Sequence, residues 1–100
     1  MNSLPDLSLV IACYNETDIL TNNVKEVVEV LDATRYTYEF IFIDDCSQDN
    51  TRELIDALIE QYADKSFRRI FHDQNKGRGR TVTDGIREAR GTVVGFIDID

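Results

Sequence analysis

The sequence is poor in the residues that mark specialised classes of protein. Its 100 residues contain two cysteines, one proline, one histidine and no tryptophan. Cys13 and Cys46 are too few for a disulfide framework and too isolated for a zinc site, so we interpret them as buried free thiols. The chain contains no internal repeat, linker or low-complexity segment, and its length suits a single domain, residues 1–100.

Long hydrophobic runs are also missing. No apolar run approaches the ~18 residues that a membrane-spanning helix needs. Residues 1–6 lack the basic start and the apolar core of a secretory signal. The expected location is cytoplasmic, which includes the cytoplasmic face of a membrane in a full-length protein. Membrane association would come only from regions outside this chain or from a lipid acceptor.

Positive charge is scarce, because 11 Lys and Arg residues stand against 19 Asp and Glu residues, for a net charge of −8. This balance argues against binding to nucleic-acid backbones. An anionic ligand would need either a local basic patch or a bridging metal ion.

Short apolar segments alternate along the chain with amphipathic ones. The apolar segments predict strands at residues 7–13, 38–43, 67–71 and 93–97. Apolar residues spaced by three and four predict helices between these strands. The predicted buried stripes are Leu20, Val24, Val27, Val28 and Leu31 in the first helix, Leu54, Ile55, Leu58, Ile59 and Tyr62 in the second, and Val82, Ile86 and Ala89 in the third.

Polar residues and glycine predict the helix ends. Asn15 is a suitable N-cap for the first helix and is followed by acidic residues that favour a helix start. Ser47 or Asp49 is suitable for the second helix, and Gly91 predicts the end of the third.

This alternation predicts an α/β fold with a parallel sheet, right-handed crossovers and helices packed on its faces. Ligands of such sheets bind beyond the carboxyl ends of the strands, where the strand order reverses. The unusual polar groups follow the predicted strands, namely Tyr14, Asn15 and Glu16, then Asp44 and Asp45, then the loop 72–80, then Asp98 and Asp100. The sequence therefore predicts a ligand site at this edge of the sheet.

Asp98 and Asp100 are two carboxylates separated by one residue. On an extended strand they would point to the same face, roughly 7 Å apart along the chain. One interpretation is an ordinary strand-end turn. The more specific hypothesis is a site for Mg²⁺ or Mn²⁺, because such ions use one or two carboxylates and take their other ligands from water and substrate phosphates. A diphosphate would then reach this acidic chain through the metal.

Asp44 and Asp45 follow the second predicted strand. One carboxylate can cap the next helix or hold the loop while the other faces a ligand, and a carboxylate is suited to accept the ring N–H of a nucleobase. Tyr14 is either a half-buried core aromatic or a flat surface for a base.

Residues 75–80, Asn-Lys-Gly-Arg-Gly-Arg, form the only dense basic cluster. The cluster is either a solvated loop or a phosphate clamp in which Gly77 and Gly79 let the backbone approach the ligand. The sequence has neither a Walker phosphate loop nor a Gly-x-Gly-x-x-Gly fingerprint after its first strand. His72, the only histidine, is expected to pack at a strand end rather than to act in catalysis.

The motifs in this order resemble those of the inverting glycosyltransferases of family two, which have the GT-A fold. Residues 10–16, Val-Ile-Ala-Cys-Tyr-Asn-Glu, resemble their opening motif, and residues 44–51 resemble their Asp-Asp-x-Ser-x-Asp-x-Thr segment. Residues 75–91 are similar to their glycine loop and following helix, and residues 98–100 match their metal-binding Asp-x-Asp. The glycine loop and the ending Gly-Phe-Ile-Asp-Ile-Asp look closest to the branch resembling dolichol-phosphate mannose synthase, which loads sugars onto polyprenyl phosphates.

The resemblance implies a Rossmann-like three-layer sandwich with strand order 3-2-1-4, the N-terminal half of a GT-A fold. It also implies binding of a UDP- or GDP-linked sugar with Mg²⁺ or Mn²⁺, for transfer to an acceptor such as a polyprenyl phosphate or a saccharide. The implied nucleotide-binding residues are Tyr14, Glu16, Asp45, Lys76, Gly77, Arg80 and Asp98, and the implied metal ligands are Asp98 and Asp100.

The chain departs from the family in length and at two motif positions. Family members continue well beyond the Asp-x-Asp with an acceptor site and a catalytic base, so we expect a truncated nucleotide-sugar-binding part that is inactive alone. Ala12 stands where the family usually has proline, and Cys46 where glycine or asparagine is common, which bears on the subgroup. In the order 3-2-1-4 the fourth strand is an edge strand, and we expect a homodimer or aggregation through it.

Other classes explain less of the sequence. A sugar nucleotidyltransferase has a similar alternating plan, but its glycine-rich loop after the first strand is absent. A signalling module that is phosphorylated on aspartate could use Asp44 and Asp45, but it requires a lysine on a fifth strand. A non-catalytic nucleotide-binding or scaffold module remains an alternative.

Overall fold

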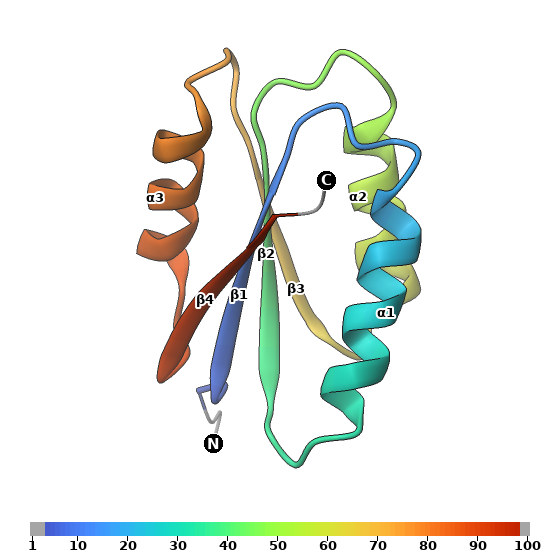
Figure 1. Cartoon of the computed structure of the whole chain (residues 1–100), viewed down its shortest axis with the longest axis vertical. Helices are drawn as coiled ribbons and strands as arrows, with labels where there is room; N and C mark the ends of the chain where they lie inside the picture. The colour runs from blue at the N-terminus through green and yellow to red at the C-terminus, as the bar shows by residue number, and fades with distance from the viewer. Residues whose placement is uncertain (1–3, 99–100) are drawn as a thin grey trace.

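The computed structural model describes residues 4–98, in which strands and helices alternate strictly (Figure 1). The strands are β1 (Leu7–Cys13), β2 (Tyr38–Asp44), β3 (Ser66–Phe71) and β4 (Val93–Asp98). The helices are α1 (Leu20–Asp32), α2 (Thr51–Gln61) and α3 (Arg78–Glu88). The element order and the strand positions predicted from the hydrophobic pattern are confirmed.

The strands form one parallel sheet in the order β3-β2-β1-β4, which confirms the predicted order. The register places Cys13 opposite Asp44, Asp44 opposite Phe71, and Ala12 opposite Asp98. All the carboxyl ends therefore meet at one edge of the sheet. The strand order reverses at β1, which is where parallel sheets of this kind bind ligands.

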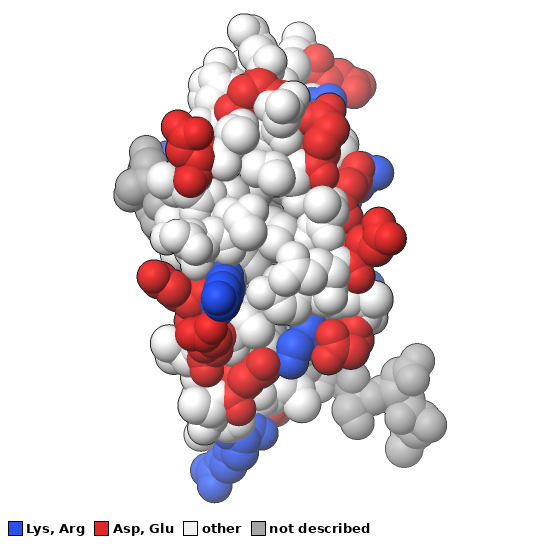
Figure 2. All heavy atoms as spheres, turned by 90° about the vertical axis from the view of Figure 1, so that its right-hand side faces the viewer, with Lys and Arg blue, Asp and Glu red and all other residues white. Residues whose placement is uncertain are grey.

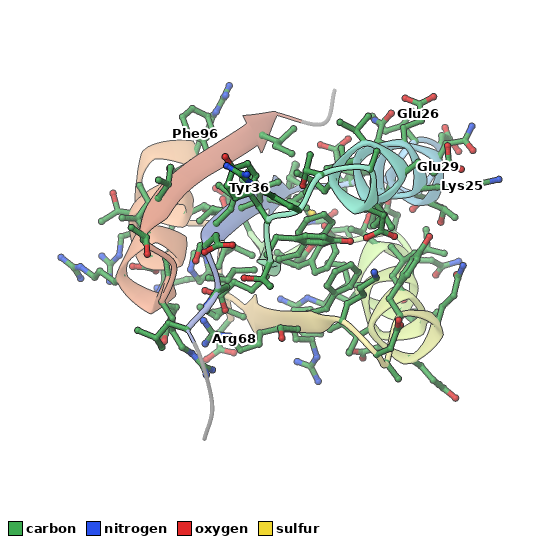
Figure 3. All side chains as sticks on the ribbon, turned by 90° about the horizontal axis from the view of Figure 1, so that it is seen from below. Lys25, Glu26, Glu29, Tyr36, Arg68 and Phe96 are labelled. Atoms are coloured by element: carbon green, nitrogen blue, oxygen red, sulfur yellow. The ribbon has the colours of Figure 1, made fainter. Side chains whose placement is uncertain are left out.

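The sheet is the middle of three layers, with α1 and α2 on one face and α3 on the other (Figures 1 and 3). The face under α1 and α2 carries the larger core, in which the rings of Phe40 and Phe67 stack 4.5 Å apart. The face under α3 carries a smaller cluster of Val10, Ile41 and Ile43. Burial of these apolar side chains is the main force that holds the layers together.

Helix α3 contacts the sheet through small residues, which corrects the apolar stripe predicted for it. Thr81 and Gly85 are its buried residues, whereas Ile86 is 47% exposed. A Cβ atom at position 85 would lie 2.3 Å from Cγ1 of Val10, so only glycine permits this approach. The sequence pattern failed here because close helix packing selects small side chains rather than large apolar ones.

The predicted start of the first helix was wrong. Helix α1 begins at Leu20 and its N-cap is Ile19, so Asn15 is not a capping residue. Asn15 instead has a positive φ of 53° and accepts a hydrogen bond from the backbone N–H of Gln48 through Oδ1, at 2.9 Å. Asparagine tolerates this left-handed conformation better than most residues, and here it joins two loops.

Two further end predictions were resolved by the structure. The N-cap of α2 is Asn50, so the prediction that Ser47 or Asp49 caps this helix was wrong. Asp49 Oδ1 does accept the backbone N–H of Thr51 at 2.9 Å, and Ser47 bonds to Asp44. Helix α3 ends at Glu88, so Gly91 is not its stop. A Cβ atom at position 91 would lie 2.7 Å from the backbone nitrogen of Ser8, so close contact with β1 explains this glycine.

Charge is distributed unequally between the two helical layers. The outer face of α1 and α2 carries many acidic and few basic side chains (Figure 2), and Lys25, Glu26 and Glu29 point outward from α1 (Figure 3). The basic loop, residues 76–80, leads instead into α3 on the opposite side of the sheet. An anionic ligand is therefore expected on the α3 side.

Strand β4 is an edge strand with exposed apolar side chains. Val93 is 60% exposed and Phe96, labelled in Figure 3, is 52% exposed. The homodimer through this edge stays a prediction. No helix within residues 4–98 is long and apolar enough to cross a membrane.

Candidate functional site

The adjacent carboxylates at the end of β2 point to opposite sides of the sheet, because side chains alternate along a strand. Asp44 is buried and accepts hydrogen bonds from the backbone N–H and the hydroxyl of Ser47 and from Nε of Arg52, the last at 2.9 Å. Asp44 therefore fixes the loop before α2. This confirms the prediction that one of the two carboxylates holds the loop.

Asp45 faces the α3 side and holds the glycine loop. Its Oδ1 accepts the backbone N–H of Lys76 at 2.8 Å, and its Oδ2 accepts the backbone N–H of Gly77 at 3.0 Å. Nδ1 of His72 lies 2.8 Å from Oδ1. Burial alone would raise the pKa of Asp45, but the hydrogen bonds from His72, Lys76 and Gly77 outweigh burial and lower it. Asp45 is therefore an anion that its neighbours already stabilise.

The loop after β1 is tied to the loop after β2. The backbone N–H of Asn15 donates to Oγ of Ser47 at 2.9 Å, and the backbone N–H of Glu16 donates to Oγ1 of Thr51 at 2.8 Å. Tyr14 is 43% exposed, so it is not a core aromatic. These bonds hold the Tyr14–Glu16 segment at the carboxyl edge of the sheet.

A cleft of about 270 Å³ lies between this segment and the start of α3. Four of the residues predicted to bind a nucleotide line it: Tyr14, Glu16, Asp45 and Gly77. The other lining residues are Ala12, Cys13, Asn75, Arg78 and Thr81. The structure therefore brings together side chains from the ends of β1 and β2 with the glycine loop, as the topology predicted.

Two predicted residues of the basic loop do not line the cleft. Lys76 contributes its backbone N–H to Asp45, and Nε of Arg80 donates to Oδ1 of Asp84 at 3.0 Å. Sequence reasoning instead missed Arg78 and Thr81, which do line the cleft. Arg78 belongs to the same basic cluster, so its charge was a usable signal. Thr81 gave no such signal, because a threonine within a helix is common.

Cys13 lines the cleft but is not a nucleophile. Burial raises the pKa of its thiol, and the negative charges of Asp44 and Glu16 raise it further. The thiol therefore stays protonated, as expected of a buried free cysteine. Cys46 is partly exposed, which corrects the prediction that both thiols are buried, and its thiol donates to the backbone oxygen of Asp73.

The predicted metal ligands lie at and beyond the last described residue. Asp98 ends β4 and pairs in register with Ala12 of β1, and Ala12 lines the cleft. Asp100, and with it the predicted pair of carboxylates, lies outside the described residues. Within residues 4–98 no three or more His, Cys, Asp and Glu side chains gather as a metal site.

The fold is an α/β domain with a cleft at the edge of the sheet where the strand order reverses. A family model described as glycosyl transferase family 2 matches residues 8–100, and the chain belongs to this family. Its parallel sheet in the order 3-2-1-4 is the N-terminal half of a GT-A fold.

Curated relatives include a glucosyltransferase and a protein of succinoglycan biosynthesis. The chain is 31% identical to a dolichyl-phosphate beta-glucosyltransferase of Dictyostelium discoideum, over 94% of this chain and 30% of the relative. It is 33% identical to the succinoglycan biosynthesis protein ExoO of Rhizobium meliloti, over 100% of this chain and 27% of that protein. The chain thus spans less than one third of the length of these relatives.

Solved structures share the fold at low sequence identity. The mannosyltransferase PcManGT of Pyrobaculum calidifontis, in complex with GDP-Man and Mn²⁺, superposes with a TM-score of 0.85 at 20% identity, over 98% of this chain and 28% of that one. TarS of S. aureus in complex with UDP-GlcNAc gives a TM-score of 0.72 at 23% identity, over 95% and 26%.

Proposed function

We propose that this chain is the nucleotide-sugar-binding part of a glycosyltransferase. In this proposal it binds a UDP- or GDP-linked sugar, which the whole protein transfers to an acceptor such as a polyprenyl phosphate or a saccharide. The observation that carries the proposal is the cleft that gathers Tyr14, Glu16, Asp45 and Gly77 in a member of glycosyl transferase family 2. Solved neighbours of the same fold hold GDP-Man or UDP-GlcNAc.

The base is assigned to Tyr14, Glu16 and Asp45. Tyr14 presents an exposed ring at the cleft, and a ring of this kind stacks on any base. The carboxylate of Asp45 has roughly four lone-pair directions, of which the contacts to His72, Lys76 and Gly77 use three. One direction on Oδ2 is left to accept a ring N–H of the base.

The diphosphate is assigned to the start of α3. Gly77 has a positive φ of 88° and nothing would lie within 4 Å of a Cβ atom at this position, so the backbone here is open to a ligand. The first N–H groups of a helix attract anions, and Arg78 at the same end lines the cleft. Arg80 and Lys76 add positive charge to this loop.

The metal is assigned to Asp98 and Asp100. Asp98 pairs with the cleft-lining Ala12, so Asp98 and Asp100 would hold a divalent cation near a bound diphosphate. A divalent cation there would neutralise phosphate charge that the acidic chain otherwise repels. Mg²⁺ and Mn²⁺ both suit carboxylate and phosphate ligands.

Calorimetry with UDP and GDP, with and without Mn²⁺, tests this proposal. We expect metal-dependent binding that Tyr14→Ala weakens about tenfold, since stacking on a base is worth about 1–3 kcal/mol. Tyr36→Ala is the matched control, because Tyr36 is a similarly exposed tyrosine that lines a different cleft. Equal losses in both variants, or no binding of either nucleotide, would contradict the proposal.

A further inference from the structure

His72 is buried between two carboxylates that belong to different elements. It follows β3, is 4% exposed, and places Nδ1 2.8 Å from Oδ1 of Asp45. Its Nε2 lies 2.9 Å from Oδ2 of Asp84, a residue of α3. Both ring nitrogens are therefore within hydrogen-bonding distance of an acid.

This arrangement requires a doubly protonated ring. A neutral imidazole donates from one nitrogen and presents a lone pair at the other, so one of the two carboxylates would face a lone pair. The imidazolium donates to both Asp45 and Asp84. Two buried negative charges on either side of one ring also favour the positive form.

The two acids remain ionised at neutral pH. Hydrogen bonds lower the pKa of Asp45 against the effect of burial. The hydrogen bond from Arg80 is the largest influence on Asp84 and, with His72, lowers its pKa although desolvation opposes them. On the backbone side, Arg52 of α2 donates to the carbonyl oxygen of His72 and to the carboxylate of Asp44. Among the groups named, His72 is the one whose ring can either carry a proton on both nitrogens or lack one of them while the two carboxylates stay ionised.

The imidazole is linked directly to the wall of the cleft. Oδ1 of Asp45 contacts both the His72 ring and the backbone N–H of Lys76, and Oδ2 accepts the backbone N–H of Gly77. Asn75 and Gly77 line the cleft. Asp84 in turn connects the ring to Arg80. One proton on His72 therefore helps to hold the end of β2, the glycine loop and α3 together.

We propose that His72 and Asp84 are positioning residues that hold the glycine loop in its binding arrangement only while His72 is protonated. Loss of the proton to solvent replaces one hydrogen bond by a contact between a lone pair and a carboxylate. His72 then loses its hydrogen bond to either Asp45 or Asp84, the glycine loop is held less firmly, and a nucleotide diphosphate binds less tightly. The effect on nucleotide binding rests on the proposed function, whereas the effect on the loop does not.

The loop can be tested without any nucleotide by NMR of the ¹⁵N-labelled chain. His72 is the only histidine, so its ring signals are unambiguous. We expect the ring signals to show the doubly protonated form, which donates to both carboxylates, at the acid end of a pH series and the neutral form at its alkaline end. The amide protection of Lys76 and Gly77, corrected for intrinsic exchange, should fall about tenfold or more as the ring loses its proton. Protection that stays constant through the ring titration would overturn the inference.

Nucleotide binding provides the second readout. Asp84→Ala should weaken binding of GDP or UDP with Mg²⁺ about tenfold near pH 7 and remove most of its dependence on pH. Asp84→Asn should restore part of the affinity, because its amide oxygen still accepts from Nε2. Asp73→Asn, at an exposed acid beside His72, is the control and should change neither property. Equal pH dependence in the wild type and in Asp84→Ala would also overturn the inference.

The outcomes separate the inference from the proposed function. If amide protection follows the His72 ring and no nucleotide binds at any pH, the positioning role stands and the proposed function fails. If nucleotide binds and amide protection stays the same when the His72 ring loses its proton, the proposed function stands and the inference fails.

Discussion

Strand β2 carries two buried carboxylates on its α3 face, Glu39 near its start and Asp45 just past its end, and they serve different purposes. Glu39 is 2% exposed and Asp45 is 6% exposed, so burial does not distinguish them. The pKa values of both are lowered by hydrogen bonds that outweigh burial. Neither burial nor pKa alone therefore distinguishes the acid that we propose to bind a ligand from the acid with a structural role.

Their partners do distinguish them. Glu39 accepts the hydroxyl of Ser8 at 2.5 Å, the backbone N–H of Arg90 at 2.8 Å and Nη2 of Arg68 at 3.0 Å. These donors join β1, β3 and the segment after α3 at the amino end of the sheet, where Figure 3 shows Arg68 on the α3 side. Asp45 holds the backbone of the glycine loop and lines the cleft.

The comparison shows that two features separate these buried acids: the groups that donate hydrogen bonds to each, and whether the acid lines the cleft. Glu39 closes the packing between α3 and the sheet, so we expect its loss to affect stability. Asp45 shapes a loop at the cleft, so we expect its loss to affect ligand affinity. Substitution of each acid in turn tests that division.

The largest expected effect is on stability when Glu39 is removed. Glu39→Ala leaves the donors of Ser8, Arg68 and Arg90 without their acceptor, which should lower the free energy of unfolding by about 3 kcal/mol. Urea unfolding followed by circular dichroism measures this change. Glu39→Gln keeps the acceptor oxygen and should cost clearly less. A Glu39→Ala variant as stable as the wild type would contradict the structural role assigned to Glu39.

The next effect is on affinity when Asp45 is neutralised. Asp45→Asn keeps the size of the side chain but weakens its hydrogen bonds to Lys76, Gly77 and His72. It also replaces one acceptor oxygen by an NH₂ donor, which cannot accept the ring N–H of a base. Binding of UDP or GDP with Mg²⁺ should weaken about thirtyfold, which corresponds to about 2 kcal/mol. Calorimetry on the folded variant measures it, with Glu39→Gln as the matched control. If Glu39→Gln lost as much affinity as Asp45→Asn, the division into a structural acid and a ligand-site acid would be contradicted.

A smaller effect concerns acid. A carboxyl whose pKa is lowered in the folded chain stabilises the fold at pH values above its ordinary pKa, which is 4.5 for Glu39 and 3.8 for Asp45. This stability is lost as the pH falls through the folded pKa. The midpoint of urea unfolding should therefore decrease below about pH 4. Glu39→Gln should flatten this decrease more than Asp45→Asn does. A wild-type midpoint unchanged by acid would contradict the assignment of buried anions.

The sequence allowed the fold and much of the cleft to be predicted. Apolar runs of strand length gave the strands, and polar residues directly after them, such as Tyr14 and Asp45, fell at one edge because parallel strands end there. These signals are local in sequence and depend only on the period of the pattern.

The remainder depended on contacts between distant residues. His72 and Asp84 meet only because α3 packs against the sheet, and its approach depends on Gly85, which no apolar pattern reveals. Glu39 lies within a strand whose other residues are mostly apolar, and its partners come from Ser8 and Arg90, 31 and 51 residues away. Asn15 acts through a positive φ rather than as a helix cap. Tertiary packing decides such features.

The most direct test of the account is a map of amide shifts on titration of GDP or UDP with Mg²⁺ into the ¹⁵N-labelled chain. The account predicts that the largest shifts occur at Tyr14, Asp45 and Gly77, at the carboxyl edge of the sheet, and that the amides around Glu39 and Arg90 stay unchanged. Shifts centred on Glu39 and Arg90, or spread evenly over the chain, would contradict the claim that this cleft is the nucleotide site.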